Sequence, residues 1–306
     1  MTRLDYRLGA ILTLSLALSV FAGCGGNGGG SSSGSRSGEA ASAGSSAPTA
    51  SPADTATSDA VGQAAPAAAD TLEPWEVADP STLPETNYYA IHTSQGRMVI
   101  RLYEDTPIHR QNFKKLVSED FYDGTSFHRI IEGFMIQGGD PYTKDDEIRN
   151  DGAGDPGYLL PAEIKPDNYH KRGAMAAARQ PDSRNPERRS NGSQFYIVDG
   201  REFTKAGLAQ VVNKIRKATG NEDFSLNPEA RKVYQTEGGA PNLDRQYTVF
   251  GELVEGFAVL DSIAASETFR TSEQDPPDRS LIDHPLEPIE MDVEPLPDYE
   301  PPGGET

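Results

Sequence analysis

The chain has few cysteines and histidines, the side chains that form disulfides and most often bind transition metals. Cys24 is the only cysteine among 306 residues, which excludes an intramolecular disulfide. The histidines lie far apart and show no spacing typical of a metal site; they are His92, His109, His128, His170 and His284. Stability is therefore expected to come from a hydrophobic core, and neither a metal nor another cofactor is expected.

Basic residues are also scarce. The chain has 28 Lys and Arg against 47 Asp and Glu, which gives a formal net charge of −19. A chain with this charge is repelled by nucleic acid phosphates, so no nucleic acid partner is expected. Long apolar runs are missing too, apart from one near the N-terminus that is too short for a comfortable membrane span.

That apolar run has the features of a secretory signal in residues 1–23. Arg3 and Arg7 precede LGAILTLSLALSVFAG, and the run ends at Cys24. The segment FAGC resembles the lipobox of bacterial lipoproteins, which implies that Cys24 is lipidated. We therefore expect an exported protein, anchored to the membrane through Cys24 at the periplasmic face of the cell envelope. Gly25 follows the cysteine where an aspartate often marks retention in the inner membrane, which favours the outer membrane. The alternative to lipidation is a plain secretory signal with an incidental cysteine.

Composition divides the remaining chain into three parts. Residues 24–84 begin with Cys24 and are rich in Gly, Ser, Ala and Pro, so we expect a disordered tether. Residues 85–297 contain the strand and helix patterns and form the folded domain. Residues 298–306 are expected to be a disordered tail. No internal repeat is present, and a monomer is expected.

The folded part reads mainly as short strands. NYYAIHTSQGRMVIRLY predicts a hairpin with its turn at residues 94–96, and Thr106 and Pro107 predict the start of a helix. The stretch FHRIIEGFMIQGGD, residues 127–140, predicts two strands separated by Gly133. Further strands are predicted at residues 194–198, 246–254 and 288–296. Many short strands with few helices favour a closed antiparallel β-barrel capped by two helices.

Three blocks of this sequence resemble the cyclophilin family and stand in the family's order. They are FHRIIEGFMIQGGD, SNGSQFYIV at residues 190–198 and LDRQYTVFGELVEG at residues 243–256. The resemblance extends over nearly the whole folded part, with an apparent insertion at residues 201–241. It implies a cyclophilin-like barrel and a peptidyl-prolyl cis-trans isomerase that acts on proline-containing polypeptides, assisting the folding of exported proteins in the cell envelope.

The resemblance also implies the roles of particular residues. Arg129 is the implied catalytic donor, and Gln137 positions it. The implied substrate-binding residues are Phe134, Met135, Ala176, Ala177, Gln194, Tyr196, Leu243 and Tyr247. Tyr196 stands where the family commonly has phenylalanine. Isomerisation transfers no proton, so no carboxylate pair is expected beside Arg129, and His128 is expected to be a hydrogen-bonded structural residue.

The insertion has its own helical pattern. Leu208, Val211, Val212 and Ile215 recur at helical spacing, with Thr204 as a cap and Gly220 as a stop. Asn227 and Pro228 predict the start of a second helix that ends before Gly238. These helices are expected to pack near the pocket mouth, and a role in partner binding remains an alternative.

Other interpretations of these motifs stay open. A binding module or chaperone with weak catalysis is the alternative function, favoured by Asn242 at a position where many relatives carry an aromatic residue. The arginines of residues 173–189 either attract acidic substrates or balance nearby carboxylates. GAGDPG, residues 152–157, matches a dinucleotide-binding pattern, but Pro156 and the following sequence predict no helix, so a loop is expected.

Overall fold

A computed structural model describes residues 73–77 and 79–301. The predicted signal, Cys24 and most of the predicted tether lie outside these residues, as do the last residues of the tail from 302. Within the described part of the chain, no helix combines the length and the apolar composition that crossing a membrane requires.

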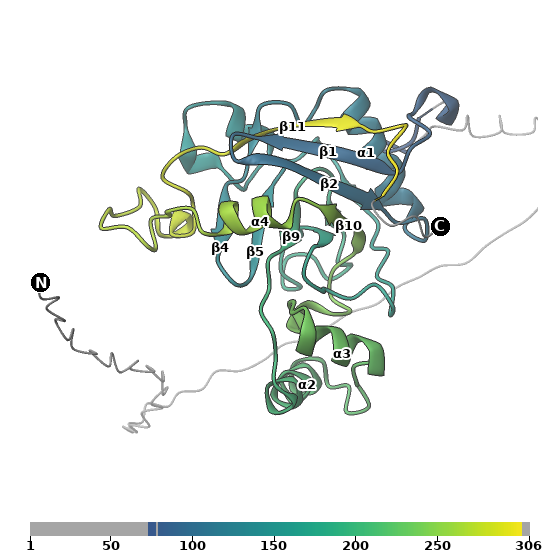
Figure 1. The fold of residues 1–306 in the computed structure, drawn as a ribbon, viewed down its shortest axis with the longest axis vertical. Helices are drawn as coiled ribbons and strands as arrows, with labels where there is room; N and C mark the ends of the chain where they lie inside the picture. The colour runs from purple at the N-terminus through teal and green to yellow at the C-terminus, as the bar shows by residue number, and fades with distance from the viewer. Residues whose placement is uncertain (1–72, 78, 302–306) are drawn as a thin grey trace, which may run out of the picture. The chain divides into compact units, whose positions relative to one another are not determined.

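The predicted N-terminal hairpin is confirmed. Strand β1 (Tyr88–Thr93) pairs with β2 (Gly96–Leu102), from Tyr88 opposite Arg101 to Thr93 opposite Gly96. Gly96 has a φ of 131°, a region that side chains other than hydrogen disfavour, so glycine suits this turn. In Figure 1 the last strand, β11 (Glu290–Pro295), lies beside β1, which in turn lies beside β2.

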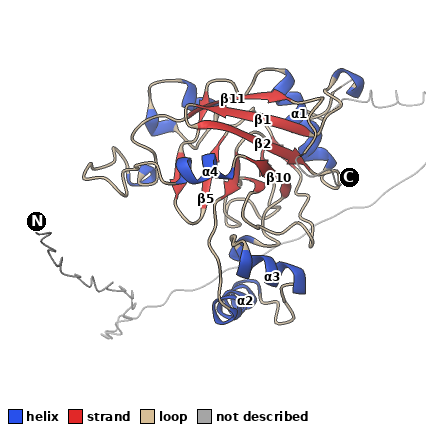
Figure 2. Ribbon diagram, viewed as in Figure 1, coloured by secondary structure: helices blue, strands red, loops and turns tan. Residues whose placement is uncertain are grey.

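Nine strands form one antiparallel sheet in the order β3-β11-β1-β2-β10-β7-β9-β5-β4. A second, two-stranded sheet joins β6 to β8. The remaining strands are β3 (Thr125–Ser126), β4 (Arg129–Ile131), β5 (Met135–Gly138), β6 (Leu159–Leu160), β7 (Ala174–Ala177), β8 (Ser190–Asn191), β9 (Phe195–Val198) and β10 (Val249–Glu255). The strands predicted at residues 194–198, 246–254 and 288–296 correspond to β9, β10 and β11. Figure 2 shows these strands in red, and the mainly β architecture is the expected one.

The two end strands of this order are consecutive in the chain. β3 pairs with β11, and β4, which starts three residues after β3 ends, pairs with β5. Between them, the Phe127 amide donates to Ile289 at 3.0 Å, and the His128 amide donates to Gln137 at 3.0 Å. One bent segment therefore contacts both edges of the sheet.

Two helices accompany the sheet, α1 (Pro107–Ser118) and α4 (Phe257–Ala264). Helix α1 starts where Thr106 and Pro107 predict it, but the Thr106 side chain makes no capping bond. Glu163 replaces it, accepting from the amides of Ile108 at 3.2 Å and His109 at 2.9 Å. Burial raises the pKa of Glu163, but its bonds with His109 outweigh this and hold the pKa below its usual value.

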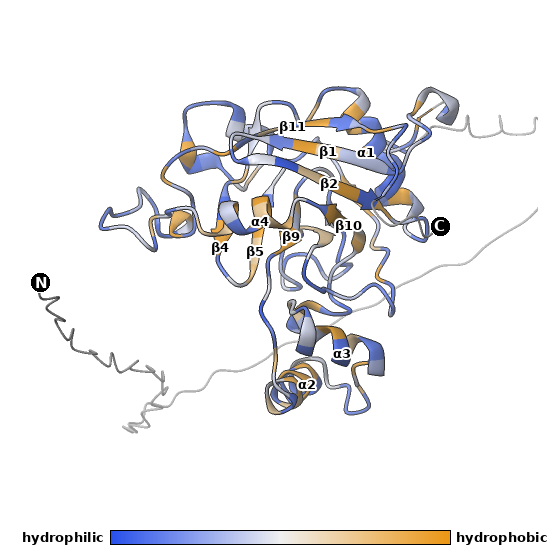
Figure 3. Cartoon of the chain, viewed as in Figure 1, coloured by the Kyte–Doolittle hydropathy of each residue, from blue (hydrophilic) through white to orange (hydrophobic). Residues whose placement is uncertain are grey.

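The core is aromatic around one residue of α1. Phe113 is only 1% exposed, and its ring centroid lies 5.0 Å from Tyr122, 5.5 Å from Tyr89, 6.1 Å from Phe250 and 6.2 Å from Phe195. These partners come from strands or loops far apart in the sequence, so Phe113 joins the helix to the sheet. Figure 3 shows hydrophobic residues on strands such as β10 and hydrophilic residues in most loops.

The helices predicted for residues 201–241 are confirmed as α2 (Lys205–Thr219) and α3 (Pro228–Thr236), side by side in Figure 1. Thr204 caps α2 by accepting from the Gly207 amide at 3.1 Å, and Gly220 ends it with a φ of 67°. The two helices share a small apolar core made by Leu208, Ile215, Phe224, Leu226, Ala230 and Tyr234.

Part of the segment predicted as a tether packs on the domain. Trp75 is 8% exposed, with its ring centroid 6.4 Å from that of Tyr158, and Leu83 is also buried. Lys115 donates to the carbonyl of Pro74 at 2.8 Å. The Gly/Ser/Ala/Pro composition averaged over the tether concealed these two apolar side chains.

The short 3-10 helices lie in loops. They are η1 (Pro80–Thr82), η2 (Pro141–Lys144), η3 (Ile148–Asn150), η4 (Pro241–Leu243) and η5 (Arg279–Leu281).

Candidate active site

Seven of the ten residues predicted for the active site surround one pocket of about 120 Å³. They are Arg129, Phe134, Met135, Gln137, Tyr196, Leu243 and Tyr247, and Ala178 and Arg179 complete the lining. Ala178 and Arg179 were not predicted, although they directly follow Ala177. Ala176 and Ala177 lie in β7, buried and opposite Tyr196 and Phe195 of β9, and Gln194 lines a neighbouring pocket.

The hairpin of β4 and β5 places the two polar residues of this pocket. Arg129 pairs directly with Gln137 across the hairpin, so both side chains emerge on the same face. Gly133 supplies the turn with a φ of 70°, and its amide donates to Asp199 at 2.6 Å. Phe134 and Met135 follow at once, which sets apolar side chains beside the guanidinium.

Arg129 is partly exposed and faces the pocket. Its side chain is 42% exposed, and its Nη1 donates to Gln137 Oε1 at 3.4 Å. It lines the same pocket as Phe134, Met135 and Leu243, so the guanidinium is not directed away from the apolar side chains.

A carboxylate that was not predicted lies beside this arginine. Asp283 Oδ2 is 3.6 Å from Arg129 Nε, while Asp283 Oδ1 accepts from Arg270 Nε at 2.6 Å. The Asp283 side chain is 9% exposed, and its carbonyl accepts from the Ile130 amide at 2.8 Å. This single carboxylate was not predicted. Asp283 is far from Arg129 in the sequence, so no sequence pattern near Arg129 could reveal it.

A chain of side-chain amides orients Gln137. Gln137 Nε2 donates to Gln194 Oε1 at 3.0 Å, and Gln194 Nε2 donates to the Gly154 carbonyl at 2.7 Å. Because Gln194 uses its NH₂ group on a carbonyl, its oxygen faces Gln137, which leaves the Gln137 oxygen for Arg129. Gly154 belongs to GAGDPG, which forms a loop with no helix after it, as expected.

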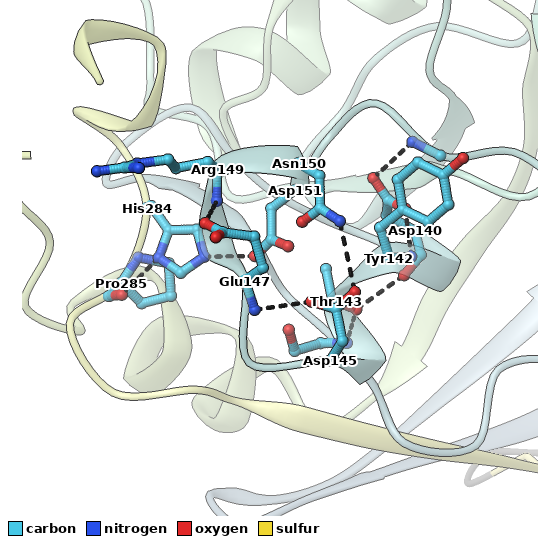
Figure 4. Close-up of polar contacts among 12 residues, drawn as sticks. Asp140, Tyr142, Thr143, Asp145, Glu147, Arg149, Asn150, Asp151, His284 and Pro285 are labelled. Carbon is cyan, nitrogen blue, oxygen red and sulfur yellow. Dashed lines mark hydrogen bonds and ion pairs between the residues drawn. The ribbon is translucent and has the colours of Figure 1, made fainter. Parts of the chain in front are cut away.

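The loop before Gly154 is fastened by its own carboxylates. Asp140 accepts from the Tyr142 amide at 2.8 Å and from the Gly154 amide at 3.0 Å. Asp151 accepts from His284 Nε2 at 2.8 Å (Figure 4). These bonds hold the loop against the end of β5, where Gln137 lies.

His128 is buried as predicted, but the predicted hydrogen bonds are wrong. Neither ring nitrogen has a hydrogen-bond partner in the described part of the chain. Burial is the largest influence and lowers the pKa of His128 to about 4, so the ring is neutral at physiological pH.

Two aromatic rings also line the pocket. Tyr196 and Tyr247 have ring centroids 5.9 Å apart at an interplanar angle of 85°. The Arg179 guanidinium lies 4.6 Å from the centroid of Tyr247, on its ring face. The two aromatic rings and the Arg179 guanidinium therefore line this part of the pocket together.

The arginine-rich loop is partly neutralised. Asp182 pairs with Arg179 at 2.6 Å and with Arg188 at 2.9 Å. Arg184 and Arg189 line the second pocket, of about 220 Å³, together with Gln137 and Gln194. Arg179 and Arg188 are thus each paired with a carboxylate, whereas Arg184 and Arg189 border the second pocket.

Comparison with known proteins decides the family. The model of the "Cyclophilin type peptidyl-prolyl cis-trans isomerase/CLD" family matches residues 88–283. The chain belongs to the cyclophilin family. The match begins at β1 and includes every residue predicted for the pocket as well as the insertion. This cyclophilin is a peptidyl-prolyl cis-trans isomerase, an enzyme that accelerates rotation about X-Pro bonds.

Individual relatives share the name. A Staphylococcus haemolyticus protein named as a peptidyl-prolyl cis-trans isomerase is 32% identical over 194 residues, covering 63% of this cyclophilin and 86% of the relative. A Staphylococcus epidermidis protein of the same name is 33% identical over 175 residues, covering 57% and 79%. A solved Cryptosporidium parvum cyclophilin, studied with the dipeptide Ala-Pro, has 24% identity and a TM-score of 0.45, covering 67% of this chain and 96% of that chain.

Proposed function

We propose that the 120 Å³ pocket binds the proline ring and that Arg129 is the catalytic donor. Rotation about an X-Pro bond has a barrier of about 18–20 kcal/mol because amide resonance must be broken. As the bond twists, the proline nitrogen becomes pyramidal and its lone pair can accept a hydrogen bond. A permanently charged guanidinium beside an apolar pocket suits this task, since it favours the twisted form over both planar forms.

The other residues of the pocket take supporting roles in this proposal. Phe134, Met135, Tyr196 and Leu243 hold the ring while the other side of the bond turns, and Gln137 positions Arg129 and bonds the substrate backbone. Ala176, Ala177 and Gln194 flank the groove for the residues before proline, and Tyr247 closes the rim. A 10⁴-fold acceleration needs a reduction of about 5.4 kcal/mol in the activation free energy. One charged hydrogen bond directed at the proline nitrogen, together with positioning of the substrate, can supply this amount.

The observation that carries this proposal is that Arg129 and Gln137 line the same pocket as Phe134, Met135 and Leu243. A protease-coupled assay with a proline tetrapeptide tests it. Catalysis above background that depends on Arg129 supports the assignment. A groove that binds proline peptides without such catalysis would favour the alternative, a binding module or chaperone.

Asp283 is expected to keep Arg129 aimed. The Asp283→Asn variant keeps the shape of the side chain but removes the charge near Arg129 Nε. Because solvent screens the partly exposed Arg129, the ion pair should contribute about 1 kcal/mol. Its loss should therefore lower kcat/KM about fivefold. Asp278→Asn is the matched control, since Asp278 caps η5 and asparagine caps equally well. Unchanged or faster catalysis in Asp283→Asn, measured with the same peptide, would remove this role.

We also propose that the nine strands act as a closed barrel. The support is the bent segment of β3 and β4, which bonds to β11 at one sheet edge and to β5 at the other. Closure would leave few free strand edges and would hold Arg129, which lies in this segment, in place.

The N-terminal sequence supports a proposed location. We infer a lipid anchor on Cys24 that attaches an exported monomer to the cell envelope, where it assists the folding of exported proteins. Mass spectrometry of the mature protein should show an N-terminus at Cys24 carrying acyl chains, and fractionation should place the protein with membranes. A Cys24→Ala variant is expected in the soluble fraction. An unmodified N-terminus at another residue would contradict the anchor.

A further inference from the structure

A chain of buried polar side chains joins the insertion to the proline pocket. Tyr234 of α3 donates its hydroxyl to Asp244 at 2.7 Å and 2.8 Å, and Asp244 Oδ1 lies 3.1 Å from His170 Nδ1. His170 Nε2 lies 3.0 Å from the hydroxyl of Tyr196, which lines the pocket. We call Tyr234, Asp244, His170 and Tyr196 the buried polar chain.

The chemistry of these groups sets the direction of the bonds to Asp244. An ionised carboxylate only accepts, so Asp244 requires a proton on His170 Nδ1. His170 Nε2 then bonds to the Tyr196 hydroxyl, which can donate or accept. Asp244 also accepts from the His170 amide at 3.0 Å. Every member is at most 5% exposed, so solvent does not compete for these bonds.

Both ends of the buried polar chain are closely packed. At the insertion end, Tyr234 is fully buried in the small core shared by α2 and α3. Gly239 has a φ of 149°, and a Cβ there would clash with the His170 carbonyl oxygen and the Tyr234 ring. At the pocket end, the His170 and Tyr196 rings are stacked with centroids 6.0 Å apart at 11°.

Asp244 also connects the buried polar chain to Leu243, a second residue that lines the pocket. Asp244 directly follows η4, whose last residue, Leu243, lines the pocket. A shift of Tyr234 would therefore act on Tyr196 through His170 and on Leu243 through the backbone. Phenylalanine, which the family commonly carries at the position of Tyr196, could not bond to His170.

We propose that the insertion sets the shape of the proline pocket through the buried polar chain, with Tyr234, Asp244 and His170 as positioning residues for Tyr196 and Leu243. This inference rests on the proposed function of the pocket. It assigns the insertion a role in substrate affinity, because Tyr196 and Leu243 contact the ring equally in the planar and the twisted forms.

A double-mutant cycle on the full-length protein tests the coupling. Tyr234→Phe removes only the hydroxyl that Asp244 accepts from, and Tyr196→Phe removes the hydroxyl at the other end. Tyr234→Phe should weaken the binding of an Ala-Ala-Pro-Phe peptide, followed by NMR titration, about three- to tenfold, with kcat within about twofold. In the Tyr196→Phe background the same change should alter Kd less than about twofold, because the chain is already broken.

The controls separate positioning from general stability. Tyr169 packs against Tyr234 in the same small core, with centroids 5.9 Å apart, but is not a member of the buried polar chain. Tyr169→Phe should leave Kd within about 1.5-fold of the wild type. The ¹⁵N signals of the His170 ring should shift in both Tyr234→Phe and Tyr196→Phe, and not in Tyr169→Phe.

Two outcomes would overturn the inference. One is an unchanged Kd in Tyr234→Phe, and the other is an effect of Tyr234→Phe that is the same in both backgrounds. The wild type and Arg129→Ala are measured in parallel. If the wild type catalyses in an Arg129-dependent manner and either outcome occurs, only the role of the insertion fails. If the wild type does not catalyse, the proposed function of the pocket fails first.

Discussion

Arg129→Ala is expected to lower kcat/KM for a proline peptide by about 10²- to 10³-fold, the usual effect of removing one aimed donor from a transition state. Arg129 is the only guanidinium of the β4–β5 hairpin that lines the pocket, and Gln137 cannot replace its charge. The loss should fall mainly on kcat, since apolar side chains such as Phe134 and Met135 still hold the ring. The measurement is the protease-coupled assay at several enzyme concentrations.

Two comparisons make this prediction specific. Arg129→Lys should recover only part of the activity, because lysine is a point charge without the planar fork of arginine. Arg97→Ala, an exposed arginine of β2 paired with Glu255 at 4.0 Å, should leave activity unchanged. If wild type and Arg129→Ala both run at the uncatalysed rate, the proposed mechanism is abandoned.

Phe113→Ala is expected to lower the free energy of unfolding by about 3–5 kcal/mol. Phe113 contacts the rings of Tyr89, Tyr122 and Phe250, so its removal leaves a cavity and breaks several aromatic pairs at once. For a domain of this size the Tm should fall on the order of 10 °C. Denaturant unfolding followed by tryptophan fluorescence and calorimetry measures both quantities.

The matched control is another phenylalanine on a helix. Phe257 of α4 is 39% exposed and lies against the Arg172 guanidinium at 5.8 Å. Phe257→Ala should therefore cost less than about 1 kcal/mol. A similar loss in both variants would mean that Phe113 is not the centre of the core.

Local pattern was enough for much of the fold. The hairpin of β1 and β2 and the helices α1, α2 and α3 follow from strand alternation, turn residues and capping residues, all of which act within a few positions of the chain. Helix α4 was not placed by sequence, because it follows β10 directly and has no side-chain cap at Gly256. Trp75 was missed because one buried ring does not change the composition of a long polar segment.

The residues of the candidate site also fall into those that a local motif predicted and those that it could not. Arg129, Gln137, Phe134 and Met135 are close in sequence, and one hairpin brings them together. Tyr196, Leu243 and Tyr247 could be named only through the resemblance to the family, since no local pattern joins them to Arg129.

The amino-acid sequence by itself determined the hairpin that carries Arg129, the helices of the insertion and the family to which the chain belongs, because these depend on residues that are neighbours or that recur in one motif. Tertiary structure alone decided that Glu163 caps α1, that Asp283 lies beside Arg129, and that Tyr234 reaches the pocket through Asp244 and His170. Hydrogen bonds and ion pairs act over a few ångströms in space, and only the folded backbone brings such distant positions within that range.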